Sequence, residues 1–236
     1  MKIKNLLIVL FLFVITASYA DNYDVIKVDA EPVLDGKLDD VVWNLANKSC
    51  TNFKDDKTGN IAQAQTFVKL IYTNTYLYLG LKCNEPKMNL LISNRTEHDS
   101  ALYMEDSVEL FFDCKKTRDN YMQFVLNTIN THYDEENGNK GVNPLWESAV
   151  YKDMENKFWS VEVKIPFSSL VLNNPVVGTK WGANFCRNRV GAEVESSSWA
   201  GIVGLYAQPN LFYEITFVGP SSIEEKNWGK IKAIFK

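Results

Sequence analysis

The sequence predicts an all-β protein, an antiparallel β-sandwich of immunoglobulin- or jelly-roll-like type with short helical turns. Two observations carry this prediction. Short segments alternate apolar and polar side chains with the period of two that a strand with one buried face requires. Turn-forming residues separate these segments at short intervals, and no stretch keeps the 3.6-residue period of a long helix.

The first expected elements lead from an entering strand to a hairpin. A short helix begun by Asp39 follows the Asp35-Gly36 turn, with Trp43 on its apolar side. The hairpin turns at Thr73-Asn74-Thr75. We expect the entering strand at 25–33, the helix at 39–46, a polar surface loop at 51–60, and the hairpin arms at 65–72 and 76–84.

The stretch 103–113 organises the rest of the prediction. Val108, Leu110 and Phe112 alternate with Glu109 and other side chains on the opposite face. A carboxylate on a buried strand is costly unless it meets a partner or a ligand. We therefore expect the functional site to lie around this strand.

The remaining elements complete one domain over residues 21–236. Pro166 is well placed at the first position of a short helix or turn that follows the cleanest amphipathic strand. We expect strands at 121–128, 146–151, 159–165, 181–189 and 211–218, and a polar loop at 131–141.

Residues 1–20 have the pattern of a secretory signal peptide. Lys2 and Lys4 precede an apolar run over 6–17, and Ser18 and Ala20 supply the small residues before a cut. The run is too short to span a membrane, which takes about 20 apolar residues. We expect a soluble protein, secreted to the periplasm or the extracellular space after cleavage near Ala20.

Charge and cysteine content exclude several classes of function. The net charge is −4, and a chain of that sign lacks the basic surface that binds nucleic acid or an anionic membrane. Neutral ligands fit it better. The four cysteines show no CxxC spacing, which argues against a structural zinc site. They allow three disulfide pairings, and the number of disulfides stays open.

Catalysis is less strongly indicated than binding. Asp106 and Glu109 lie three residues apart on one strand, about 10 Å, and point to opposite faces. They cannot form the carboxylate pair of a glycoside hydrolase, which needs about 5 Å in retaining and up to about 9.5 Å in inverting enzymes. The sequence has no Gly-x-Ser-x-Gly elbow. We assign no catalytic residue, and a glycoside hydrolase, or an accessory subunit acting on O-glycosyl bonds, remains the alternative.

No cofactor or metal ligand is assigned. The acidic stretch 134–137 matches no calcium-loop spacing and is interpreted as a solvated loop, although structural calcium stays open. A haem- or protein-binding sandwich is a third hypothesis, in which His98 and Met104 would be the available axial haem ligands.

Trp199 differs from the tryptophans expected in the core, such as Trp43 and Trp159. It follows Ser196-Ser197-Ser198 and precedes Ala200-Gly201, a polar setting in which we expect its indole to be partly exposed. An exposed aromatic ring beside hydrogen-bonding groups suits a sugar, which has an apolar face and a rim of hydroxyls. A rim residue packed on a loop is the alternative interpretation.

The chain resembles the family 9 carbohydrate-binding modules and their relatives. Each matching motif is weak alone, but the set follows the family's order across nearly all of residues 21–236. The motifs are Leu34-Asp35-Gly36 through Trp43-Asn44-Leu45-Ala46, 105–113, Tyr121-Met122-Gln123-Phe124 with Asn127, Trp146-Glu147-Ser148-Ala149, 159–167, 181–189 and Ser198-Trp199.

The resemblance implies a sandwich that grips a terminal sugar between two aromatic side chains. Trp199 would be one of them, Tyr103 the other, and Glu109 would accept a sugar hydroxyl. Relatives that bind strongly have tryptophan where Tyr103 stands, so we expect weaker binding. The further polar partners that it implies are Arg95, Asn127 and Arg189. We thus expect a non-catalytic protein that binds oligo- or polysaccharides, xylan- or glucan-type chains or their ends, in carbohydrate catabolism, without nucleic acid or membrane insertion.

Overall fold

A computed structural model describes residues 22–46, 48–191 and 193–220, and the predicted signal peptide lies outside this range. The described chain is all-β, with short 3-10 helices between strands. Its strands are β1 (Tyr23–Lys27), β2 (Lys54–Asp55), β3 (Thr66–Tyr72), β4 (Tyr76–Asn84), β5 (Ser107–Asp113), β6 (Met122–Asn127), β7 (His132–Glu136), β8 (Glu147–Asp153), β9 (Phe158–Pro166), β10 (Lys180–Arg189), β11 (Glu195–Ser198) and β12 (Tyr213–Pro220). Its helices are η1 (Val41–Leu45), η2 (Met88–Leu90), η3 (Leu102–Met104), η4 (Phe167–Ser169) and η5 (Pro209–Leu211). Within these ranges no helix has the length and apolar character needed to cross a bilayer.

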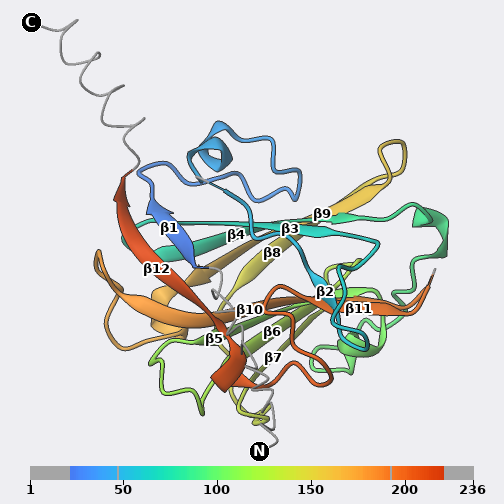
Figure 1. Cartoon of the computed structure of the whole chain (residues 1–236). Helices are drawn as coiled ribbons and strands as arrows, with labels where there is room; N and C mark the ends of the chain where they lie inside the picture. Colours follow the sequence, from blue (N-terminus) through green and yellow to red (C-terminus); the bar gives the residue numbers. More distant parts are fainter. Residues whose placement is uncertain (1–21, 47, 192, 221–236) are drawn as a thin grey trace, which may run out of the picture.

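The strands form one mixed sheet (Figure 1). The main path runs β7-β6-β5-β10-β12-β1-β3-β4-β9-β8, with β11 and β2 added beside β10. The prediction of a purely antiparallel sheet is wrong at β1, which pairs in parallel with both β12 and β3. A parallel neighbour needs a long crossover, and residues 28–65 provide it between β1 and β3.

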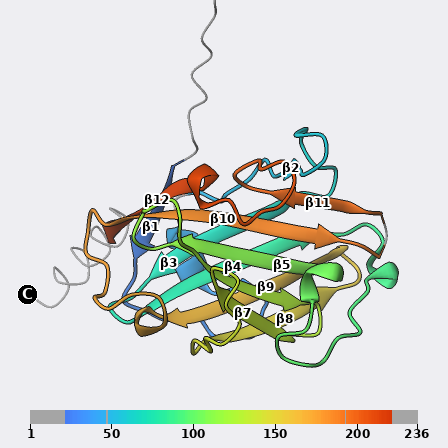
Figure 2. The same ribbon diagram turned by 90° about the horizontal axis from the view of Figure 1, so that it is seen from below.

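The sheet curls so that its two halves enclose one core. Leu79 and Val163 from β4 and β9 pack in the same buried cluster as Leu110 and Phe124 from β5 and β6. Figure 2 shows the half that contains β5 and β10 as a layer over the half that contains β3, β4 and β9. The alternating apolar residues of the sequence supply this core because successive side chains of a strand point to opposite faces.

Glu162 of β9 fastens the 34–46 segment to the sheet. Its buried carboxylate accepts hydrogen bonds from Asp35 N at 2.9 Å, Gly36 N at 2.8 Å and Trp43 Nε1 at 2.7 Å. Gly36 has φ of +83°, and a Cβ there would lie 2.7 Å from Tyr151 N, so glycine is required. The Leu34-Asp35-Gly36 and Trp43 motifs are therefore structural, and η1 confirms the short helix predicted at 39–46.

Two strands lie where polar loops were expected. The prediction of a loop at 131–141 is wrong at 132–136, which form β7, and the prediction of a loop at 51–60 is wrong at 54–55, which form β2. β11 likewise consists of polar residues. Polar side chains hid these strands from a search for apolar alternation. In β7 the buried Glu135 is satisfied by the hydroxyls of Tyr121 and Tyr133, which is how a carboxylate is tolerated there.

Candidate functional site

The candidate site lies on the face of β5 that points away from the core. Glu109 and Phe111 are on this face, and β6 and β10 flank it on either side. Gln123 lies opposite Phe111 on β6, and Asn188 lies opposite Ser107 on β10. Because the residues of an antiparallel pair share a face, both amide side chains are brought next to Glu109.

Glu109 is buried and held by two amide groups. Gln123 Nε2 donates to Oε2 and Asn188 Nδ2 donates to Oε1, both at 2.6 Å. Burial raises the pKa of Glu109 to about 7; the two hydrogen bonds lower it, and the charge of Glu135 raises it further. Within the described residues no arginine or lysine forms an ion pair with this carboxylate, so its ionised form can accept from a hydroxyl that reaches it.

A cavity of about 280 Å³ opens over this carboxylate. Tyr103, the middle residue of η3, is 44% exposed and packs its ring edge-on against Tyr133 with centroids 6.1 Å apart. Leu205, 84% exposed, belongs to the loop that also lines the cavity. The lining consists of Asp56, Tyr103, Glu109, Phe111, Gln123, Asn188 and residues 204–207. Its size and its mix of aromatic and polar groups suit one sugar ring.

Trp199 does not line this cavity. The expectation that its indole is exposed is wrong: the residue is 3% exposed. Its ring stacks on Phe185 at 5.5 Å and meets Tyr213 edge-on at 5.1 Å. The preceding serines form β11 on the edge of β10 rather than a flexible loop, so the chain delivers Trp199 to the core. It has no free face to offer a sugar.

Asn127 and Arg95 hold the segment that leads to Tyr103. Asn127 Nδ2 donates to Arg95 O at 2.9 Å and to Glu105 Oε2 at 3.2 Å. Arg95 Nε lies 3.9 Å from Glu105 Oε1. Neither residue lines the cavity around Glu109, so the geometry gives both a positioning role.

Arg189 belongs to a buried ion-pair cluster. Its Nε donates to Glu85 Oε2 at 2.7 Å and its Nη2 to Glu85 Oε1 at 3.0 Å, while Arg187 Nη2 reaches the same carboxylate at 3.0 Å. Arg189 shares the face of Val108, opposite to that of Glu109, because β10 alternates. Of the six residues suggested for sugar binding, only Tyr103 and Glu109 line one cavity.

Replacing Glu85 by alanine is expected to destabilise the protein by about 3–5 kcal/mol, because two buried guanidinium groups lose their counter-ion. Urea unfolding followed by circular dichroism measures the change. Glu193→Ala is the matched control, since this exposed carboxylate also contacts Arg189, at 3.4 Å, and should matter far less. Equal effects of the two substitutions would contradict a structural role for the cluster.

The comparisons with known proteins place the chain in a family. The model for "Carbohydrate family 9 binding domain-like" matches residues 34–216. The chain belongs to this family.

Relatives of the family 9 domain include enzymes and isolated modules. Exoglucanase XynX of Acetivibrio thermocellus is 28% identical over 158 residues, which are 62% of this chain but 13% of that much longer protein. A family 9 module from Caldicellulosiruptor kristjanssonii, solved with cellotriose, has a TM-score of 0.63 at 21% identity and covers 86% of this chain and 96% of its own. The same module with glucose has a TM-score of 0.61 at 20% identity, over 86% of this chain and 98% of its own. A putative carbohydrate-binding protein from Bacteroides uniformis reaches 0.65 at 14% identity, over 84% and 99%. At these identities the solved structures establish the fold.

Sequence reasoning missed Asp56, Gln123, Asn188 and Tyr206 as candidates. Asn188 is next to Arg189, and only the pairing register of β10 with β5 decides which of them faces Glu109. Gln123 lies on a strand that apolar alternation identified. Its place on the face opposite the apolar side chains was the signal that could have pointed to it. Asp56 follows β2, whose pairing with β11 spans more than half of the family 9 domain.

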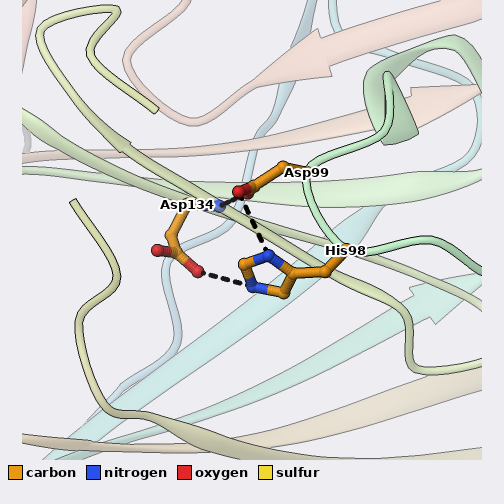
Figure 3. Close-up of side chains that lie close together, drawn as sticks. All are labelled: His98, Asp99 and Asp134. Atoms are coloured by element: carbon orange, nitrogen blue, oxygen red, sulfur yellow. Dashed lines mark hydrogen bonds and ion pairs between the residues drawn. The ribbon is translucent and has the colours of Figure 1, made fainter. Parts of the chain in front are cut away.

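His98, Asp99 and Asp134 form a cluster whose ligand atoms lie within 4.8 Å of one another (Figure 3). His98 Nδ1 lies 3.1 Å from Asp99 Oδ2, and Nε2 lies 3.2 Å from Asp134 Oδ2, which also accepts from Trp146 Nε1. A metal that takes nitrogen and carboxylate ligands could be held here. Both ring nitrogens already face carboxylates, so the cluster joins the 85–102 segment to β7. Ligation of a haem iron by His98 would require one of its ring nitrogens to give up its carboxylate partner.

Asp56 is the second carboxylate of the cavity over Glu109. The sequence excludes Asp106 as a catalytic partner of Glu109, because the two side chains point to opposite faces of one strand. In the structure Asp106 Oδ2 accepts from Ile92 N at 2.7 Å and Gly191 N at 3.0 Å, so Asp106 fixes backbone. Asp56 instead lines the cavity and comes from a distant element.

Proposed function

We propose that this family 9 domain is a secreted, non-catalytic protein that binds one sugar residue of a glucan- or xylan-type saccharide in the cavity over Glu109. The observation that carries the proposal is the buried Glu109 carboxylate at the base of a cavity of about 280 Å³, with Tyr103 at its rim. The carboxylate and its two amides offer acceptors and donors to hydroxyls, and the aromatic ring offers a flat apolar surface.

The solved relatives with cellotriose and glucose support a saccharide as the ligand. The net negative charge supports a neutral one. The pattern of residues 1–20 supports export from the cytoplasm. Outside the cytoplasm the protein would meet polysaccharides. A role in carbohydrate catabolism follows from the same ligand class and is part of the proposal.

Isothermal titration calorimetry with glucose, xylose, cellotriose and xylotriose tests the proposal. We expect saturable binding in the micromolar to millimolar range, about −8 to −4 kcal/mol. Tyr103→Ala should weaken binding about 3- to 10-fold, because stacking on an aromatic ring contributes about 0.5–1.5 kcal/mol. Tyr151→Ala on β8 is the control and should bind as the parent does. Unchanged binding in the Tyr103 variant would show that the sugar does not bind at this cavity.

Glycoside hydrolysis is the second candidate, favoured by the presence of Asp56 and Glu109 in one cavity. A carboxyl with a raised pKa can serve as the general acid of such a reaction, and Glu109 has this property. Hydrolysis would release reducing sugar from xylan or cellotriose, and this release would vanish in both Glu109→Gln and Asp56→Asn. Binding without any such release supports the module.

A further inference from the structure

The cavity over Glu109 carries acidic groups without a basic one. Asp56 and Glu109 both line it, and none of the described residues of its lining is a lysine, arginine or histidine. Glu135 lies next to this site on the same face, opposite Gln123. Lys57, the next residue, is the cation that lowers the pKa of Asp56, and its side chain is exposed. The site therefore has a local negative potential that a neutral sugar leaves uncompensated.

Asp56 is held in place but not fully hydrogen-bonded. Its backbone N donates to Ser196 O at 2.9 Å, and its backbone O accepts from Gly204 N at 2.9 Å. These bonds tie Asp56 both to β11 and to the loop that carries Leu205. Its Oδ1 is buried without a hydrogen-bond partner. The backbone of Asp56 is thus fixed, while a buried carboxylate oxygen without a donor is costly, so a ligand group that donates to this carboxylate would be favoured.

Aromatic rings complete the lining. Phe111 and Tyr206 belong to one buried cluster and line the cavity, and the exposed Tyr103 lines it as well. A cation near aromatic faces is attracted by the negative charge of the ring surface. Acidic groups combined with several aromatic rings are the chemistry that recognises an ammonium group.

We propose that the cavity binds a sugar bearing a protonated amine in preference to the same sugar bearing a hydroxyl. This inference rests on the proposed function, since it names the sugar class for the same site. The ammonium group supplies donors to Asp56 and a positive charge to the acidic cavity, whereas a hydroxyl supplies neither charge nor a charge-assisted hydrogen bond. The amine belongs either to a free amino sugar or to the end of a chain of amino sugars, which share this chemistry.

The raised pKa values agree with this geometry. Burial raises the pKa of Asp56, and the neighbouring Asp55 adds to the rise, while Lys57 lowers it. Burial also raises the pKa of Glu109 to about 7. A bound cation favours the ionised form of a carboxyl. An amino sugar therefore offsets the cost of burying these charges, whereas a neutral sugar leaves that cost in place.

Calorimetric titration near neutral pH tests the preference with four matched probes: glucose, glucosamine, N-acetylglucosamine and glucuronic acid. We expect glucosamine to bind about tenfold more tightly than glucose, and glucuronic acid more weakly than glucose. The acetylated probe, which keeps the nitrogen but loses the charge, should lose the advantage. Adding about 0.5 M NaCl should reduce the preference. A trimer of glucosamine distinguishes a chain end from a free sugar.

The Asp56→Asn variant keeps the shape of the side chain and removes its charge. We expect the ratio of glucosamine to glucose affinity to fall to about twofold or less. Asp153→Asn, at the end of β8 and outside the lining of the cavity, is the control and should keep the parental ratio. Equal binding of glucose and glucosamine by the parent, or an unchanged ratio in Asp56→Asn, would overturn this inference alone. Failure of every probe to bind would overturn the proposed function as well.

Discussion

Replacing Glu109 by glutamine is expected to weaken sugar binding by about 10- to 100-fold, because a hydrogen bond to a charged acceptor contributes about 1.5–3 kcal/mol. The glutamine keeps the volume of the side chain. Gln123 Nε2 and Asn188 Nδ2 both donate to the carboxylate, and an amide can accept at only one of its two positions. Titration with glucose or cellotriose measures the loss. Glu147→Gln, on the exposed side of β8, is the control; parental affinity in Glu109→Gln would contradict the assignment.

The same variant should change how stability depends on pH. The pKa of Glu109 is raised from 4.5 to about 7, so the folded state holds this proton more tightly than the unfolded state. Stability is then greatest below about pH 4.5 as far as this group is concerned, and falls as pH rises towards 7. The loss amounts to about 3 kcal/mol at most. Thermal unfolding of Glu109→Gln at several pH values should lack this pH-dependent loss of stability. A binding residue that costs the folded protein stability is expected to behave in this way.

Trp199→Ala is expected to lower the free energy of unfolding by about 3–5 kcal/mol, because the substitution leaves a large cavity in the core. The indole stacks on Phe185, contacts Tyr213, and is 3% exposed. Urea unfolding at neutral pH measures the change, and Trp199→Phe, which fills most of the space, should lose much less. Parental stability combined with lost sugar binding would show that the ring is a sugar-binding surface after all.

Strands with one apolar face could be located from the sequence. The arms predicted at 65–72 and 76–84 are β3 and β4 within a residue, and 103–113 contains β5. The parallel pairing of β1 could not be predicted from the sequence, because alternation shows which side chains share a face of a strand but not which strands are its neighbours. Polar strands such as β7 and β11 were hidden, since their buried side chains are satisfied by hydrogen bonds rather than by apolar packing.

The candidate site was predictable only in part. Glu109 stood out as a carboxylate on an apolar strand, and Tyr103 was implied by the resemblance to the family 9 modules. Choosing Asn188 rather than Arg189 requires the register of β10, and a shift of one residue exchanges the two faces. Trp199 was misplaced because a run of serines can form an edge strand as well as a loop. Asp56 joins the site through a contact between β2 and β11, which no local pattern reveals.

The central claim is that the cavity over Glu109 receives a sugar. Backbone amide spectra of the ¹⁵N-labelled protein, titrated with glucose up to about 100 mM, test it most directly, since binding in the millimolar range saturates there. We expect saturable shifts at Tyr103, Glu109, Gln123, Asn188 and residues 204–207. Shifts confined to another surface, such as the outer face of β3 and β4, or no saturable shift at all, would contradict it.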